Sequence, residues 1–324
     1  MRRREVIKHL TGLALAGVPA IVMGQPTRKP KIGYLSPASP PDFNLESFQL
    51  GMRAAGFEAG RNYDFEIRYA ERDYSRFERL ISELLSSEVT VIVLAGPASK
   101  AAPLAAPRVP VVFGFSGDPV EAGIVKSFSR PGGNTTGVSF LALELAAKRV
   151  DVLKDVAPAM VRLAFLSNPD HAGEGSELRV SERAAVRLGV DTLYFPARNS
   201  AELSQALNAI ASSGCDGLLA FPDALTLFHI KDVASFALER KLPSMYGWRV
   251  FAQNGGLITY GPNLRDAYAR LATYVVKIIN GASPANLPVE EPSRIETIVN
   301  LRTAKRIGLA VSSALLLRAD EVIE

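Results

Sequence analysis

A regular alternation of short β-rich runs and amphipathic helical stretches is the feature that most constrains the fold of this chain. The run at residues 31–36 (KIGYLS) is followed by a helical pattern over 44–55, and the run at 64–70 by a second helical pattern. The second pattern places apolar residues at the spacing of one helical stripe: Phe77, Leu80, Ile81, Leu84 and Leu85. Residues 89–95 and 109–116 are nearly continuous apolar runs, as in strands that are covered on both faces. The alternation predicts βαβ units built around a parallel sheet.

The same pattern returns in the second half of the chain. β-rich runs are found at residues 162–167, 191–196, 216–221 and 243–246, and helical stretches at 176–188, 200–212 and 224–240. The two halves have comparable size and are joined near residues 137–143. The sequence therefore predicts the α/β class, with two doubly wound, Rossmann-like lobes.

The last part of the chain holds more elements than one lobe needs. A strand at 256–260 precedes a helix that Asn263 can cap, and a proline-rich crossing with Pro284, Pro288 and Pro292 comes before a final strand and tail. Two lobes that share the end of the chain would use all of these elements. We therefore expect hinge strands between the lobes. The first lobe is predicted to hold residues 28–140 and 256–285, and the second 141–255 and 286–324.

The N-terminal sequence is typical of an export signal. Residues 2–8 are rich in arginine and lysine, and residues 10–23 form an uncharged, mostly apolar stretch. About 20 apolar residues are needed to span a bilayer, so this stretch is too short for a helical anchor. Small residues at its end, Ala20 and Gly24, suit signal-peptidase cleavage, which predicts a signal peptide at 1–24. The stretch RREVIK resembles the twin-arginine motif, although an ordinary Sec signal stays open.

Charge and cysteine content exclude several classes of protein. The charged residues among positions 2–8 carry +3 of the formal charge of +4, which leaves about +1 for the rest of the chain. Nucleic-acid binding needs a cluster of basic residues on the folded domain, so no nucleic-acid partner is expected. The single cysteine, Cys215, permits no intramolecular disulfide, and no cysteine follows the apolar stretch to carry a lipid anchor.

Motifs of common catalytic and cofactor sites are missing from the sequence. Beyond the signal peptide the chain has two histidines, His171 and His229, and it lacks HExxH, CxxC, Walker and GxGxxG patterns. We therefore predict no metal and no cofactor. Residues 114–118 (GFSGD) come near the G-x-S-x-G nucleophile elbow around Ser116, but Asp stands at the final glycine position. No catalytic residue is assigned.

Polar and aromatic residues follow the predicted strands of both lobes. Ligands of open α/β sheets lie outside the carboxyl ends of the strands, where helix N-termini supply N–H donors. The candidate ligand-binding residues are Ser36, Asp42, Phe43, Gly96, Pro97, Ala98, Ser116, Asp118, Asn168, Pro222, Asp223, Tyr246 and Tyr260. Two alternatives stay open at this point: Asp118 and Asp223 could cap helices instead, and the three aromatic residues could belong to the core.

Several segments together resemble a known family. They are GMRAAGFEAGRNYDFEIRYAE (51–71), GDPVEAGIVKSFSRPGGNTTGVSF (117–140), FPDALTL (221–227), ITYGPNL (258–264), YVVKIINGASPANLPVEEP (274–292) and LLLRADEVIE (315–324). Their order and spacing, together with the opening RRREVIKHLTG, resemble ABC-transporter substrate-binding proteins of the type I periplasmic-binding fold. Relatives in this family bind tryptophan or other aromatic amino acids. The resemblance covers nearly the whole chain.

The resemblance implies a periplasmic protein that is a monomer, is not lipid-anchored and is not an enzyme. It would capture an amino acid or an aromatic compound between its lobes and deliver it to an ABC permease and ATPase in the inner membrane. The family's ligand contacts fall on Ser36, Asp118, Asn168, Asp223, Tyr246 and Tyr260. Residues 95–99 (AGPAS) depart from the family pattern, because the hydroxyl that many relatives carry before the proline is missing.

Other functions remain compatible with the sequence. A periplasmic sensor would bind the same solute and report to a receptor. An exported hydrolase or isomerase would use Asp118 or Asp223 with Glu121. The effector half of a transcription regulator has the least support, because no DNA-binding helix pair precedes Lys31.

Overall fold

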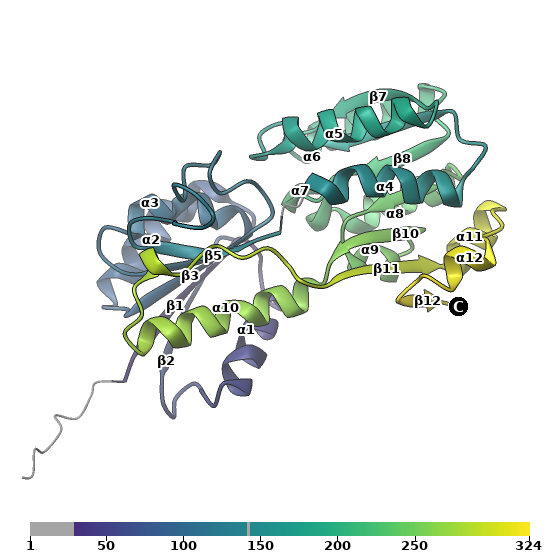
Figure 1. Ribbon diagram of the computed structural model, residues 1–324. Helices are drawn as coiled ribbons and strands as arrows, with labels where there is room; N and C mark the ends of the chain where they lie inside the picture. Colours follow the sequence, from purple (N-terminus) through teal and green to yellow (C-terminus); the bar gives the residue numbers. More distant parts are fainter. Residues whose placement is uncertain (1–28, 141–142) are drawn as a thin grey trace, which may run out of the picture.

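The computed structural model describes residues 29–140 and 143–324, which form two α/β lobes (Figure 1). The predicted signal peptide at 1–24 lies outside the described residues. Within these two ranges no helix combines the length and the apolar character that a membrane crossing requires. The α/β class and the two doubly wound lobes predicted from the sequence are confirmed.

The first lobe is built on a five-stranded parallel sheet with the order β2-β1-β3-β4-β5. Its strands are β1 (Lys31–Ser36), β2 (Asp64–Tyr69), β3 (Val91–Ala95), β4 (Val111–Phe115) and β5 (Thr135–Ser139). One face is covered by α1 (Phe43–Ala54) and α10 (Leu264–Ile279). The other face is covered by α2 (Phe77–Ser86), η2 (Gly96–Ala101) and α3 (Ala102–Ala105), and the short turn η1 (Tyr74–Arg76) precedes α2. β3 and β4 are buried along their whole length because both faces are covered.

The second lobe repeats this arrangement and extends it. Its sheet has the order β12-β11-β10-β9-β8-β6-β7, and only the pair β10–β11 is antiparallel. The strands are β6 (Arg162–Ser167), β7 (Asp191–Pro196), β8 (Gly217–Ala220), β9 (Ser244–Tyr246), β10 (Ile258–Pro262), β11 (Ile295–Asn300) and β12 (Glu321–Ile323). The order β7-β6-β8-β9-β10 matches the order of the first sheet, so both lobes are doubly wound in the same way.

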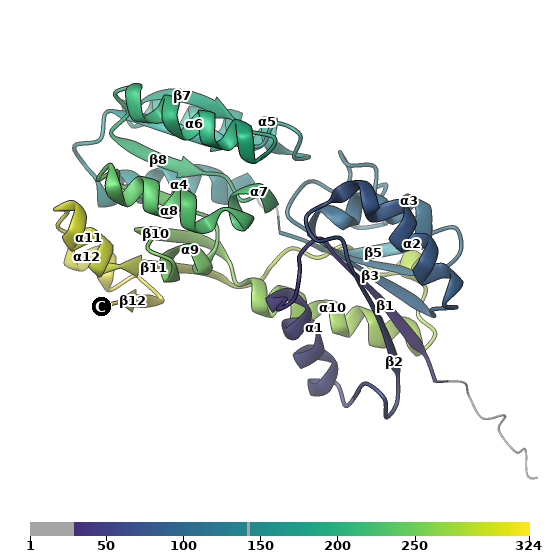
Figure 2. The same ribbon diagram turned by 180° about the vertical axis from the view of Figure 1, so that it is seen from behind.

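Helices cover both faces of the second sheet as well. One core contains residues of α4 (Leu143–Val156), α5 (Glu174–Arg187), α11 (Leu301–Ile307) and α12 (Ser313–Leu316). The opposite core contains residues of α6 (Ser200–Ser212), α8 (Ile230–Glu239) and α9 (Arg249–Gln253). The short helix α7 (Ala224–Phe228) follows β8 on the side that faces the first lobe (Figures 1 and 2).

The chain passes between the lobes more than once. It crosses after β5, again between β10 and α10, and a third time between the turn η3 (Pro284–Asn286) and β11. The sequence assigned 256–285 to the first lobe, but β10 pairs with β9 and β11 in the second sheet. The sequence of a short apolar strand does not indicate which of the two sheets the strand joins. The crossing comes at Asn263, whose side chain accepts a hydrogen bond from the Asp266 amide and so starts α10.

Close packing of α1 on α10 leaves no room for a side chain at Gly51. A Cβ there would lie 2.3 Å from the carbonyl oxygen of Ala269. We expect Gly51→Ala to lower the free energy of unfolding by about 1–3 kcal/mol, because the two helices must move apart. Gly175→Ala in α5 is the matched control: its nearest neighbour, the end of the Arg179 side chain, is 3.4 Å away. Urea unfolding followed by circular dichroism measures both, and equal midpoints would contradict the prediction.

Candidate functional site

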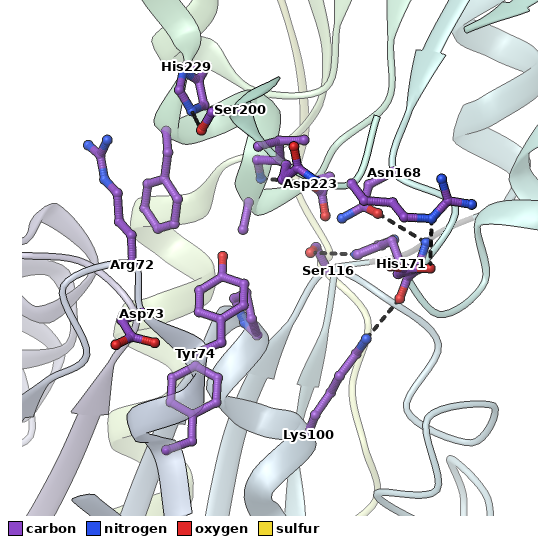
Figure 3. Close-up of a pocket in the computed structure, with 18 of the residues that line it drawn as sticks. Arg72, Asp73, Tyr74, Lys100, Ser116, Asn168, His171, Ser200, Asp223 and His229 are labelled. Carbon is purple, nitrogen blue, oxygen red and sulfur yellow. Dashed lines mark hydrogen bonds and ion pairs between the residues drawn. The ribbon is translucent and has the colours of Figure 1, made fainter. Parts of the chain in front are cut away.

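A cleft runs between the two lobes and consists of three adjoining cavities. The main cavity has a volume of about 500 Å³ and is lined by loops from both lobes (Figure 3). A narrow waist of about 40 Å³ shares Pro97, Ser116, Ala224 and Phe228 with the main cavity. A hinge pocket of about 310 Å³ shares Trp248 and Leu264 with the waist. The three cavities are therefore neighbours along the cleft between the lobes.

The doubly wound topology explains where the cleft lies. Ser116 directly follows β4 of the first lobe, Asn168 follows β6 of the second, and Asp223 comes shortly after β8. All parallel strands of a sheet end at the same edge, so each lobe presents a set of strand-to-helix loops there. The two edges face each other across the cleft, and polar groups from both meet in the main cavity.

Six of the thirteen residues predicted from the sequence line this cleft. Pro97, Ser116, Asn168 and Asp223 line the main cavity. Gly96 lines the waist together with Pro97 and Ser116. Phe43 lines the hinge pocket, and the guanidinium of Arg265 lies 5.1 Å above its ring.

Four predicted residues of the first lobe line none of the three cavities. They cap or support the loops, or are buried in the core. The hydroxyl of Ser36 donates to Asp42 at 2.6 Å, and Asp42 in turn accepts from two backbone amides at the start of α1. Asp118 caps its own loop, accepting from the amides of Val120 and Glu121. Ala98 is fully buried in the core beside α2. For Asp118, capping was the alternative that the sequence left open.

Three predicted residues of the second lobe also lie away from these cavities. Tyr246 is fully buried, and its ring stacks on Phe251 with the ring centres 4.4 Å apart. Tyr260 contributes its backbone carbonyl, which accepts from Nε of Arg149 at 2.9 Å. Pro222 is buried, and a Cβ on Gly247 would lie 2.3 Å from its ring. These residues shape the second lobe behind the cleft.

Asp223 is a buried carboxylate that faces the main cavity (Figure 3). The residue is only 4% exposed. Its Oδ1 accepts from the Leu225 amide at 2.6 Å and caps α7, whereas Oδ2 accepts no hydrogen bond from the residues that the structure describes. Burial and then the charge of Asp223 raise the pKa of Tyr74 well above its usual value, so the phenol stays neutral. A buried acid with a free acceptor oxygen suits an ammonium group.

Cations enter the main cavity chiefly from the first lobe. Arg72 reaches across the cleft to Phe228, and its guanidinium carbon lies 4.8 Å from the centre of that ring. Its guanidinium donates no hydrogen bond to any residue in the described ranges. Both Glu71 and Arg72 have positive φ, 57° and 67°, a conformation that costs about 1–2 kcal/mol per non-glycine residue. Lys100 is engaged, since its ammonium donates to the carbonyl of Asp170 at 2.8 Å.

His171 makes a contact between the lobes at the edge of the main cavity. Its Nε2 lies 2.9 Å from the hydroxyl of Ser116, and its ring centre is 5.9 Å from that of Phe115. The next residue, Ala172, accepts a hydrogen bond from the Asp118 amide at 3.0 Å. Burial lowers the pKa of His171, which favours the neutral imidazole.

Several cavity residues were missed by the sequence analysis. They are Arg72, Asp73, Tyr74, Lys100, Phe115, His171, Arg198, Ser200, Phe228 and His229. Most lie several residues beyond a strand end, where a pattern of strands and turns gives no direction for the side chains. One signal was available: His171 is one of two histidines beyond residue 28 and follows Asn168 within the same loop.

We also searched the described residues for side chains that could bind a metal ion. Among the residues that the structure describes, no three His, Cys, Asp or Glu side chains gather as ligands for a metal ion.

Comparisons with known proteins identify the family through one family model and the fold through solved structures. The family model for the ABC transporter substrate binding protein matches residues 41–323. A tyrosine-binding protein of Clostridioides difficile (strain R20291) is 23% identical over 271 residues, which is 83% of this chain and 77% of the relative. A domain from Streptococcus pneumonia solved in complex with L-Trp has a TM-score of 0.85 at 23% identity and covers 91% of this chain and 100% of its own. A conserved domain protein from Vibrio cholerae has a TM-score of 0.84 at 24% identity, with the same coverage.

Proposed function

Because the chain belongs to the family of ABC transporter substrate-binding proteins, as its sequence resemblance predicted, we propose that it captures a small solute between its lobes for an ABC-type importer. One observation carries the proposal: the buried Asp223 carboxylate turns a free acceptor oxygen toward an interlobe cavity of about 500 Å³. A pocket of this size suits a small molecule, and its charged groups come from both lobes.

The proposed solute is an amino acid with an aromatic side chain. Its ammonium pairs with Asp223 of the second lobe, and its carboxylate pairs with Arg72 of the first. Tyr74, Phe115 and Phe228 supply apolar ring surface in the same cavity. Two similar proteins, a tyrosine-binding protein and a domain solved in complex with L-Trp, support this class of solute.

Binding and closure are one process in this proposal. A solute that touches both Asp223 and Arg72 binds the closed arrangement of the lobes more tightly than the open one. It therefore shifts the population toward closure by the difference between those two affinities. The contacts Ser116–His171 and Arg72–Phe228 join the lobes in this structure, and we take this arrangement as the closed one.

The cellular setting is part of the proposal. The protein acts as a monomer in the periplasm after cleavage of the signal peptide at 1–24, and an ABC permease and ATPase read its closed surface. A periplasmic sensor would use the same cleft. Deletion of the gene for this protein distinguishes the two roles, because solute uptake is lost only if the protein serves an importer.

Thermal stability provides the first test. A solute at 100 times its Kd stabilises the native state by about 2.7 kcal/mol, which raises the Tm of a chain of this length by several degrees. We expect L-tryptophan or L-tyrosine to give such a shift. Tryptamine lacks the carboxylate and indole-3-propionate lacks the amine, so each should shift the Tm far less. Equal shifts from all of these compounds would contradict the two-point ionic recognition.

A second candidate function, an exported hydrolase, is favoured by one observation. Ser200 lies 2.8 Å from Nε2 of His229, and Nδ1 of His229 lies 2.9 Å from Asp232, which is the connectivity of a catalytic triad. Ser200 and His229 line the main cavity, but the Asp232 side chain is 66% exposed and so gives the imidazole little electrostatic support. Recovery of unchanged solute from the protein would rule this function out.

A further inference from the structure

The loops around Gly117 and Ala172 bring the lobes into close contact at His171. The Asp118 amide donates to the Ala172 carbonyl at 3.0 Å, and a Cβ on Gly117 would lie only 2.7 Å from the same oxygen. Only glycine permits this approach. The contact holds His171 of the second lobe 2.9 Å from Ser116 of the first. Opening the cleft must therefore break the Ser116–His171 hydrogen bond and return the imidazole to water.

Groups from four elements act on the His171 ring in the closed arrangement. Burial is the largest influence and lowers its pKa. Asp223 at the start of α7 opposes this, and Lys100 of η2 lowers the pKa further. Glu174 of α5 and Glu121 of the loop after β4 raise it by smaller amounts. The net direction is down, so the closed arrangement favours a neutral ring.

We infer that His171 couples solute binding to a proton: the lobes close on the solute only around a neutral imidazole, and acidification opens them. This inference rests on the proposed function, since it concerns the regulation of the same cleft. It makes His171 a positioning residue, which acts through the contact between the lobes.

The direction of the pH effect follows from the two states of the ring. In the open state the solvated imidazole titrates near its ordinary pKa of 6.5, whereas closure lowers that pKa. Closure is therefore fully available above pH 6.5 and is lost as the pH falls below it. A solute ammonium on Asp223 removes the strongest attraction for a proton on His171, so binding expels that proton.

The expected change of the Kd with pH is that of a binding reaction linked to one proton. Between pH 7.5 and pH 5.5 the Kd should rise by up to about tenfold, because one protonation with a pKa of about 6.5 competes with closure. Below pH 6.5, binding should release up to one proton, and above pH 7.5 almost none.

Isothermal titration calorimetry with L-tryptophan at pH 7.5, 6.5 and 5.5 measures the Kd. Repeating it in buffers with different heats of ionisation gives the number of protons that binding releases. The wild-type protein should lose affinity toward pH 5.5 and release a proton. His171→Gln keeps a neutral polar side chain beside Ser116, so its Kd should not change with pH. His229→Gln removes the other cleft histidine and should keep the wild-type pH dependence, whatever its affinity at pH 7.5. A wild-type Kd that is the same at pH 7.5 and 5.5 overturns the inference and leaves the proposed solute intact.

A ligand-independent measurement separates the two proposals. The radius of gyration from small-angle X-ray scattering, without added solute, should increase from pH 7.5 to pH 5.5 in the wild type and stay constant in His171→Gln. If L-tryptophan binds at no pH, the proposed solute is wrong and the scattering decides the inference alone. The same pH response in both proteins overturns it.

Discussion

Asp223→Asn should weaken L-tryptophan binding by about 30-fold to several thousandfold and leave the fold intact. Asparagine keeps the size of the side chain and the oxygen that caps α7 through the Leu225 amide. What it removes is the buried negative charge that would pair with the solute ammonium. Losing one partner of a buried charge pair costs about 2–5 kcal/mol of binding free energy. Calorimetry gives the Kd, and a melting curve without solute checks the fold.

The matched control makes the same substitution at a carboxylate outside the cavities. Asp118 also caps backbone amides, and it lines none of the three cavities. Asp118→Asn should therefore leave the Kd within about threefold of the wild-type value. If Asp223→Asn behaved in the same way, the ammonium would have another partner and the proposed orientation of the solute would fail.

Arg149→Met should lower the free energy of unfolding by about 3–5 kcal/mol, the largest loss of stability expected for a substitution outside the cleft. The Arg149 guanidinium donates to Glu177 at 2.6 Å, and both side chains are only 3% exposed. Burial lowers the pKa of Arg149 and raises that of Glu177, because each charge has given up water. Removing the arginine leaves an uncompensated buried carboxylate. Urea unfolding at pH 7.5 measures the loss.

The loss of unfolding free energy in Arg149→Met should depend on pH in a definite direction. Without Arg149 the raised pKa of Glu177 lets it protonate more readily in the native state than in the unfolded chain, so the deficit should shrink as the pH falls. Arg187→Met removes a salt bridge that is far more exposed, with Asp151 as partner, and should cost less than about 1 kcal/mol. A double variant, Arg149→Met with Glu177→Leu, should recover part of the loss. Equal midpoints for Arg149→Met and Arg187→Met would contradict the prediction.

Strong local patterns account for the parts of the fold that the sequence predicted well. The runs at 31–36, 162–167 and 191–196 have the same bounds as β1, β6 and β7 in the structure, and the stretch at 200–212 has the bounds of α6. The strand β5 (TTGVS) was missed, because its short polar residues are buried only by the tertiary contacts of β4 and the returning chain near Glu290. Helical periodicity over 224–240 also did not reveal the break at His229 between α7 and α8.

The cleft was harder to predict than the strands. Sequence reasoning placed the site at strand ends, which is right for Ser116 and Asn168. It could not tell that Tyr246 turns into the core and stacks on Phe251, since both faces of its strand are covered. It also could not foresee that the left-handed backbone at Arg72 sends its side chain across to Phe228. Side-chain direction in loops depends on contacts distant in sequence, which no local pattern contains.

The position of α10 has a consequence for the order in which the protein can fold during synthesis. Its residues Tyr268, Leu271 and Val275 complete one core of the first lobe, yet they come after β6 to β10 of the second lobe in the chain. When residues up to 262 have been made, this face of the first lobe is covered by α1 alone, and the part that α10 covers is still exposed. The first lobe can therefore complete this core only after α10 has been made, and until then its open face is a surface for chaperones or for aggregation.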